Sequence, residues 1–223
     1  MNGLIETFFN LQVMQQYLPK VIEGMGITVL LATAVVLTGL ALGFALGVLR
    51  SLRIRPVNLL IVLFADVFRA VPPLVILIII YFAFPTIGLR FSGFASAWIG
   101  LSLVLAAFAE EIVWAGILSV PRGQWEAARA SGLSFAQSLR YVVLPQAARL
   151  TIAPLTSRAI VITKNTALAS VVAVGEILYQ AQAAYSFSYN PSPLTLGAIA
   201  YLILFIPLVW LGRWVETRLA WKR

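Results

Sequence analysis

Residues 25–49 read MGITVLLATAVVLTGLALGFALGVL, a run without a single charged side chain. A helix needs about 20 mostly apolar residues to cross a hydrocarbon layer of about 30 Å, so this run predicts a membrane-spanning helix. Gly39, Gly43 and Gly47 recur every four residues and leave one face of that helix without side chains. Such a face allows close packing on a neighbouring helix. We expect packing within the chain, with dimerisation as the alternative.

Apolar blocks also follow this run on its C-terminal side. They extend over about 57–84, 94–120, 150–174 and 194–211. Together they predict an all-α integral membrane protein with about five spans, organised as a single domain over residues 1–223. The segment 1–24 mixes polar and apolar residues and lacks the cationic start of a cleavable signal peptide. We expect it to lie on the membrane surface as an amphipathic segment.

The composition supports a lipid environment. Of the 223 residues, 61% are hydrophobic and 11% charged, whereas a soluble domain carries roughly 25% charged residues. The net charge of +8 does not indicate nucleic acid as a partner, because the basic residues lie between apolar blocks, as the positive-inside rule predicts. Histidine and cysteine do not occur, so the commonest metal ligands and catalytic bases are missing. We expect no metal site and no enzyme.

The distribution of lysine and arginine predicts the orientation. Cytoplasmic loops near the ends of spans collect these residues. Arginines are frequent after the first span and in the polar stretch 121–149, and basic residues recur in the tail. The opposite side carries only Lys20 and Arg90. We therefore expect the N-terminus outside and the C-terminus inside, which five spans satisfy.

The stretch 121–149 is too charged to cross lipid, and its first part reads PRGQWEAARASGLSFAQSLRYVVLP. Gly132 is suited to the left-handed conformation that ends a helix. Ser134 and Gln137 fit the capping box that starts a second helix, while Pro145 limits how far that helix can run. The pattern predicts a short, small-sided cytoplasmic helix that is slim enough to enter a groove on another protein. A plain amphipathic connector is the alternative.

This stretch resembles the EAA loop of ABC-importer permeases. The family pattern is Glu-Ala-Ala, three residues, Gly, nine residues, an aliphatic residue, one residue and Leu-Pro. It is filled here by Glu126-Ala127-Ala128, Gly132, Val142 and Leu144-Pro145, with valine where isoleucine is commoner. Further matches resemble the polar amino-acid branch of the superfamily, namely Tyr17-Leu18-Pro19, Glu23-Gly24, Phe68-Arg69 with Pro72, Gly116 to Pro121, Gly123-Gln124-Trp125 and Gln146-Ala147.

The resemblance implies a permease subunit of an ATP-driven importer for polar amino acids or related zwitterions, in a bacterial inner membrane. It implies assembly with two ATPase subunits, a second copy or a homologous permease, and a periplasmic binding protein that delivers the substrate. Contact with the ATPase then falls on Glu126, Ala127, Ala128, Arg129 and Gly132. No Gly-Lys dipeptide occurs, so no Walker A loop can form. We expect ATP and magnesium on the partner ATPase and no cofactor in this chain.

Ionisable residues interrupt the predicted spans. Each costs about 2.5–3.5 kcal/mol at the middle of a bilayer on insertion scales, so we expect them to face protein or a wet cavity. Candidates for the substrate path are Asp66, Arg69, Glu110, Glu111, Trp114, Lys164 and Asn165. Asp66 and Arg69 lie three residues apart, where they can pair along one helical face. For these two, a structural ion pair is the alternative.

Some positions depart from the family that the chain resembles. Asn165 stands where aspartate usually follows lysine, Glu110 where a small residue is usual, and Trp114 where arginine is common. A lost arginine beside a second acidic group favours cationic or zwitterionic substrates. Pro72-Pro73 and Pro154 are expected to break their helices, and such breaks in a membrane are tolerated beside protein or a cavity.

Two other functions compete with transport driven by ATP. An ATP-independent channel or secondary carrier would use the intramembrane charges as ion sites, but it has no use for an ATPase-docking helix. A membrane enzyme would need Asp66 or the Glu110–Glu111 pair for acid–base chemistry, and no nucleophile motif accompanies them. The EAA loop therefore favours the permease.

Overall fold

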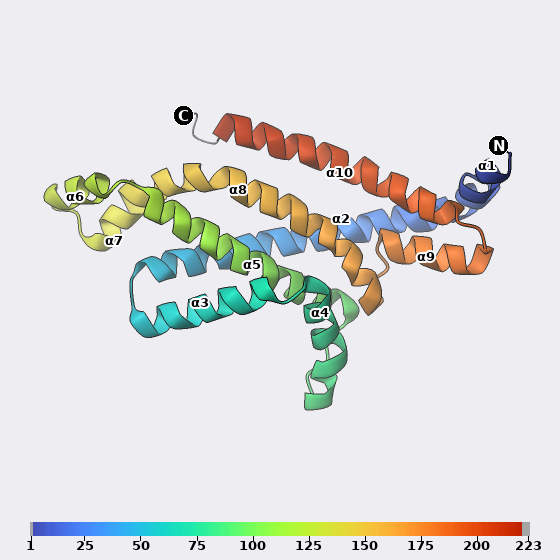
Figure 1. Cartoon of the computed structure of the whole chain (residues 1–223), viewed down its shortest axis with the longest axis horizontal. Coiled ribbons are helices and arrows are strands. Elements are labelled where there is room, and N and C mark those ends of the chain that lie inside the picture. Colours follow the sequence, from blue (N-terminus) through green and yellow to red (C-terminus); the bar gives the residue numbers. More distant parts are fainter. Residues whose placement is uncertain (1, 220–223) are drawn as a thin grey trace. The chain divides into compact units, whose positions relative to one another are not determined.

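The computed structural model describes residues 2–219; Met1 and residues 220–223, including the basic tail residues Lys222 and Arg223, lie outside the described residues. Within the described part the chain is helical without a strand (Figure 1), which confirms the all-α prediction. The helices are α1 (Asn2–Phe8), α2 (Leu11–Ser51), α3 (Arg55–Ala70), α4 (Pro73–Ile78), η1 (Ile79–Ala83), η2 (Phe84–Ile87), α5 (Gly93–Ser119), α6 (Arg122–Ala130), α7 (Phe135–Ser138), η3 (Leu139–Val143), α8 (Leu144–Lys164), η4 (Asn165–Val172), α9 (Ile177–Ser188) and α10 (Ser192–Leu219).

Three helices are long and apolar enough to cross a membrane, namely α2, α5 and α10. Two bent pairs pass the same test when each counts as one span, which brings the number to five, as expected. One pair joins α3 to α4 and its continuation, and it is broken at the predicted Pro72-Pro73 site. The other joins the helix ending at Val172 to α9.

The first long helix begins earlier than hydropathy suggests. Asn10 caps α2, because its Oδ1 accepts hydrogen bonds from the N–H groups of Gln12 (3.1 Å) and Val13 (3.2 Å). Pro19 lies inside α2 without ending it. The boundary expected at Gly24 is therefore absent, and only α1 forms a separate helix within the segment 1–24.

Two prolines do not act as predicted. Pro154 lies inside α8, which continues to Lys164. Pro145 is the second residue of α8, where the missing N–H costs little, because a π-helical turn precedes it and the Leu144 N–H bonds back to Leu139 O. The helix therefore passes from η3 into α8 without a stop. At Asn165, α8 changes into the 3₁₀ helix η4, a change that the sequence did not predict.

The described chain divides into two compact units. Unit 1 comprises Met1–Val36, Pro72–Leu101 and Val161–Trp210, and unit 2 comprises Leu37–Val71, Ser102–Ile160 and Leu211–Arg223. The core of unit 1 contains Val21, Ile177, Leu196 and Ala200. The core of unit 2 contains Val113, Ile117, Val120, Leu139, Val143 and Ala147. The candidate coupling loop thus packs into unit 2.

The glycine stripe of α2 packs against α5 inside unit 2. A Cβ atom on Gly43 would lie 2.5 Å from the Ala109 Cβ atom, and one on Gly47 would lie 2.8 Å from the Val113 Cγ1 atom. The Gly39 position meets Leu105 at 2.8 Å in the same way. The two backbones therefore approach more closely than side chains would permit, and the interpretation of the stripe as packing within the chain is confirmed.

Replacing Gly43 by alanine should lower the thermal stability of the detergent-solubilised protein. The added methyl group would overlap Ala109 and the Ala106 carbonyl oxygen, at 2.5 and 2.7 Å, and such overpacking costs about 1–3 kcal/mol. Gly26→Ala is the matched control, because Gly26 lies in the same helix and a methyl group there would meet no atom within 4 Å. At Gly26 alanine should be neutral or stabilising by up to about 1 kcal/mol. Equal melting temperatures for the two variants would contradict the packing.

Candidate functional site

The helix α6 ends in a Schellman motif centred on Gly132. Gly132 has φ +86°, the left-handed region that glycine enters without steric cost. Its N–H donates to Arg129 O at 3.0 Å, and the Leu133 N–H donates to Ala128 O at 3.2 Å. These are the two hydrogen bonds that define the motif. The left-handed turn predicted at Gly132 is confirmed.

The next helix, α7, begins with the predicted capping box. The Ser134 N–H donates to Gln137 Oε1 at 2.8 Å, and the Gln137 N–H donates to Ser134 Oγ at 3.3 Å. The reciprocal pair satisfies two backbone donors that would otherwise lack partners. Together, α6 and α7 form a hairpin whose two helix ends are both closed by local hydrogen bonds.

The hairpin is anchored to the spans of unit 2. Trp125 of α6 stacks on Phe135 of α7, with ring centroids 5.2 Å apart. Trp125 and Leu144 also pack against the core that joins α5 to η3 and the start of α8. The Gln146 side chain donates to Gln124 Oε1 at 3.2 Å. Side chains in contact therefore connect α6 to α5 and to the start of α8.

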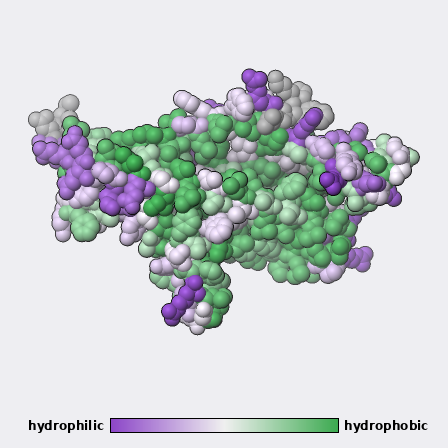
Figure 2. All heavy atoms as spheres, turned by 180° about the vertical axis from the view of Figure 1, so that it is seen from behind, coloured by the Kyte–Doolittle hydropathy of each residue, from purple (hydrophilic) through white to green (hydrophobic). Residues whose placement is uncertain are grey.

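The other side of α6 is open. Gly123, Ala127 and Ala130 are exposed, and their spacing of four and then three residues places them along one line of a helix. Glu126 and Arg129 are exposed as well, whereas Ala128 is buried. Hydrophilic side chains gather at the end of unit 2 that α6 and α7 form (Figure 2). The slim, polar-edged helix predicted from the sequence is present.

A buried ion pair lies at the end of the glycine stripe. The Arg50 guanidinium donates to both carboxylate oxygens of Glu110, at 3.0 and 3.3 Å. The Glu110 side chain is 0% exposed and that of Arg50 21%. The guanidinium also lies 5.0 Å from the ring centroid of Trp114, a cation–π distance. Glu110 is thus paired with Arg50 of the same chain. Arg50 in turn packs against the ring of Trp114.

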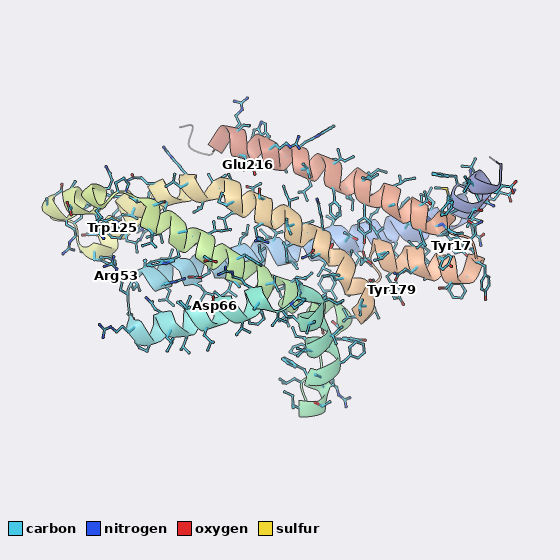
Figure 3. The ribbon with its side chains drawn as sticks, viewed as in Figure 1. Tyr17, Arg53, Asp66, Trp125, Tyr179 and Glu216 are labelled. Atoms are coloured by element: carbon cyan, nitrogen blue, oxygen red, sulfur yellow. The ribbon has the colours of Figure 1, made fainter. Side chains whose placement is uncertain are left out.

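A second, more accessible charged group lies on the same unit. Arg69 forms an ion pair with Glu111 and reaches Asp66 at 4.0 Å. The structure therefore pairs Arg69 first with Glu111 and only at the distance limit with Asp66, the pairing suggested by their spacing. Side-chain exposures of 33% for Arg69, 46% for Glu111 and 67% for Asp66 leave room for a ligand. Asp66 lies on α3 (Figure 3).

One phenyl ring of this unit, that of Phe108, lies close to two arginines. The Arg158 guanidinium carbon lies 3.6 Å from the ring centroid of Phe108, and that of Arg69 lies 5.7 Å from the same centroid. The ring attracts both cations through its electron-rich face. Among the residues that the structure describes, Arg158 forms no ion pair with a carboxylate. Its guanidinium group could therefore bind a carboxylate from a ligand.

The remaining two candidates, Lys164 and Asn165, belong to unit 1. Lys164 is the last residue of α8 and is exposed, and Asn165 opens η4 and is partly exposed. Within residues 2–219 the Lys164 ammonium group forms no ion pair. The residue that follows this lysine is Asn165, whose side chain carries no charge.

Sequence reasoning missed a buried carboxylate in unit 1. Glu176 is 0% exposed and caps α9, where its Oε1 accepts the Tyr179 N–H at 2.8 Å. Its other oxygen accepts the Tyr201 hydroxyl, and that hydroxyl oxygen accepts the Leu178 N–H at 3.2 Å. The network fixes the start of α9 to α10. An acidic residue directly before a helical run is the N-cap signal that would have located it.

From the distribution of lysine and arginine alone, Arg50 is predicted to lie in the cytoplasmic loop that follows the first span. The glycine stripe offered a better signal, because Arg50 follows Gly47 by three residues and therefore continues the face that meets α5. Glu110 lies on the part of α5 where the Gly43 and Gly47 positions make contact. The pair is thus a consequence of the packing of α2 on α5.

An all-helical chain of several apolar spans with a capped hairpin between two of them is a multi-pass membrane protein. The family described as "Binding-protein-dependent transport system inner membrane component" matches residues 39–221. The chain belongs to this family. It is the permease subunit of an ABC importer, and ATP hydrolysis takes place on a separate subunit.

Relatives in Bacillus subtilis share this assignment. The probable amino-acid ABC transporter permease protein YckA is 37% identical over 79% of this chain and 78% of its own length. The probable glutamine ABC transporter permease protein GlnM is 35% identical over 85% of this chain and 89% of its own. The arginine transport system permease protein ArtQ is 31% identical over 91% and 93%.

Solved structures agree on the fold. A crystal structure of an amino acid ABC transporter with histidines matches with a TM-score of 0.85 at 30% identity, over 92% of this chain and 97% of that chain. An inward-facing MetNI methionine ABC transporter matches with a TM-score of 0.72 at 22% identity, over 90% and 96%. The fold is therefore that of a type I ABC importer permease, as expected.

Proposed function

We propose that this permease translocates polar amino acids, or closely related zwitterions, that a periplasmic binding protein delivers. The observation that supports the proposal is the capped α6–α7 hairpin of unit 2, whose exposed helix carries the sequence that resembles the EAA loop. The names of the relatives support the substrate class, since they refer to amino acids, glutamine and arginine. A channel or secondary carrier would not require such a hairpin.

The proposed complex contains two permeases, identical or homologous, and two ATPase subunits that bind ATP and magnesium, in a bacterial inner membrane. Residues 126–132 of α6 and the turn after it dock on the ATPase through the small-residue line, which includes the exposed Ala127 and Ala130. ATP-driven closure of the ATPases displaces α6, and the Trp125–Phe135 stack passes the displacement to the spans. The cavity between the permeases then changes the side to which it opens.

We propose that Asp66, Arg69 and Glu111 of unit 2 contact the substrate on its path. We propose the same role, independently, for Lys164 and Asn165 of unit 1. The accessible charges of unit 2 suit a zwitterion, because Arg69 attracts its carboxylate while Asp66 and Glu111 attract its ammonium. Glu110 and Trp114 have a different role in this proposal. Glu110 forms an ion pair with Arg50, and Trp114 makes a cation–π contact with it. In this proposal both residues hold α2 on α5 and contact no substrate.

Purified permease, reconstituted with its ATPase and binding protein, tests the substrate class. ATP-dependent uptake into proteoliposomes should occur for one or more polar amino acids from a labelled panel, and it should require the binding protein. Uptake that continues without ATP or without the binding protein would contradict the proposal.

Lys164→Met should leave assembly intact and lower uptake at least several-fold. The residue is exposed and its ammonium group has no carboxylate partner within residues 2–219, so its removal should change stability by no more than about 0.5 kcal/mol. Assembled complex, basal ATPase activity and uptake are measured on one preparation. A variant that assembles poorly but transports normally per complex would refute the substrate-path role.

Cysteine labelling tests the proposed orientation. Because the sequence contains no native cysteine, each single-cysteine variant carries only one reactive thiol. Ser92→Cys and Ser188→Cys should react with a membrane-impermeant maleimide from outside, and Ser134→Cys should react only after permeabilisation. The α9–α10 end is then the proposed dock of the binding protein, together with Arg90, because Phe187 and Tyr189 are 80% and 91% exposed there. The reverse labelling pattern would overturn both the orientation and the docking assignments.

A further inference from the structure

A pocket of about 560 Å³ lies in unit 2, beside the coupling hairpin. Its lining combines apolar and aromatic side chains with three charged ones: Arg53, Trp114, Ile117, Leu118, Val120, Arg122, Trp125, Glu126 and Phe135. Arg53 and Trp125 lie at the same end of this unit (Figure 3). The pocket contains none of the proposed substrate-path residues, and it shares only Glu126 with the proposed ATPase dock.

The pocket lies where two membrane spans end. One wall is formed by the last part of α5, which ends as a candidate span at Ser119. Arg53 lies two residues beyond the end of α2 at Ser51. Leu118 in this wall is 58% exposed. Apolar groups on the membrane side and arginine beyond the span ends match the layering of a phospholipid at the interface, where tryptophan is also enriched.

The two arginines of the pocket are free to bind an anion. Within the described residues, neither the Arg53 nor the Arg122 guanidinium forms an ion pair. The pocket therefore presents two guanidinium groups against the single carboxylate of Glu126. A guanidinium group binds phosphate oxygens in a bidentate manner, which favours phosphate over a simple counterion.

The backbone at Arg53 is unusual for an arginine. Arg53 has φ +59° and follows the end of α2, with its N–H donating to Arg50 O at 3.2 Å. Glycine fills this left-handed position at helix ends at the lowest cost, as Gly132 does at the end of α6. A backbone outlier of this kind makes Arg53 a candidate for a functional role.

We propose that this pocket binds one anionic phospholipid, with its phosphate on Arg53 and Arg122 and the start of an acyl chain along Leu118. Basic pockets between membrane helices on the cytoplasmic side are suited to such headgroups. The inference rests on the orientation proposed above, which places this end of unit 2 in the cytoplasm.

The position of the pocket on α6 gives the lipid a consequence for coupling. Arg122, Trp125 and Glu126 face the pocket, whereas the docking line runs through Ala127 and Ala130. The two faces lie about a third of a turn apart on a helix of 3.6 residues per turn. A lipid held on one face therefore steadies the helix whose other face meets the ATPase, and coupling becomes sensitive to the anionic lipid content.

The test uses the full complex in nanodiscs of phosphatidylcholine, with and without phosphatidylglycerol. Bound phosphatidylglycerol is counted by mass spectrometry after extraction in mild detergent, and ATPase stimulation by loaded binding protein is measured in both nanodiscs. Wild type should retain phosphatidylglycerol and be stimulated more strongly in its presence. In R53Q/R122Q the affinity for phosphatidylglycerol should fall about 30-fold, and the difference between the two nanodiscs should disappear.

Arg55→Gln is the matched control, because Arg55 is exposed at the start of α3 and does not line the pocket. It should keep both the lipid and its effect. If R53Q/R122Q retained as much phosphatidylglycerol as wild type, the proposal would be overturned. It would also be overturned if the double variant lost as much ATPase stimulation in pure phosphatidylcholine as in the presence of phosphatidylglycerol. That second result would assign the two arginines to the ATPase contact. Competition by soluble glycerol phosphate with full stimulation would identify a soluble ligand and reject the lipid. Bound phosphatidylglycerol is counted without any transport measurement. A failure of the proposed transport function can therefore be distinguished from a failure of the lipid proposal.

Discussion

Gly132→Val is expected to abolish ATP-driven uptake while the membrane spans remain folded. The position has φ +86°, which a β-branched residue adopts only at a cost of about 1–2 kcal/mol or more. A Cβ atom there would meet nothing within 4 Å, so the effect arises from the backbone and not from a clash. The Schellman hydrogen bonds of α6 would be lost, and the docking helix would no longer hold one direction relative to α7.

The measurement compares uptake and ATPase activity of reconstituted complexes. The valine variant should assemble, and its ATP hydrolysis should no longer drive transport. Gly132→Asn is the control, because asparagine also occurs at left-handed helix ends, and it should keep most of the uptake. Normal uptake by the valine variant would remove the coupling role of the hairpin.

The second large effect is expected at the Arg50–Glu110 pair. Arg50→Met leaves the 0% exposed Glu110 carboxylate without its partner, and breaking a buried pair in this way costs about 3–5 kcal/mol. The yield of folded, monodisperse protein after detergent extraction should fall sharply. Glu110→Leu should cost less, since Arg50 is 21% exposed and can extend toward the aqueous interface.

A double-mutant cycle separates this role from substrate contact. Arg50→Met combined with Glu110→Leu should recover most of the lost stability, because an apolar pair of similar volume replaces a buried ion pair at little cost. Transport by the recovered variant should then be near normal. Asp66→Asn, at an exposed pair 4.0 Å long, is the control and should change stability by less than about 1 kcal/mol. A recovered but transport-dead double variant would return Glu110 to the substrate path.

Local signals in the sequence were sufficient for the hairpin. Gly132, Ser134 and Gln137 act through hydrogen bonds to residues within five positions, so their conformations depend little on the rest of the fold. The apolar runs were equally informative, because the hydrocarbon thickness sets the length of a span. These features could be predicted with no knowledge of tertiary contacts.

Other features depend on contacts between distant segments and escaped prediction. Arg50 and Glu110 are separated by 60 positions, and only the packing of α2 on α5 brings them together. The starting point of α2 was missed because hydropathy marks the apolar part of a helix and not its cap at Asn10. Pro145 and Pro154 were misread because their effect depends on the turn that precedes them and on neighbouring helices, which a rule for isolated helices omits.

The glycine stripe of α2 also restricts where the gene for this protein can gain or lose codons. A single codon inserted between Gly39 and Gly47 would turn every later residue of the helix by about 100°. Gly47 would then point away from Val113, and Arg50 would leave Glu110, although every amino acid type had been kept. Insertions should therefore be purged within this segment and tolerated at the exposed turn around Gly88, which has open space beyond its backbone.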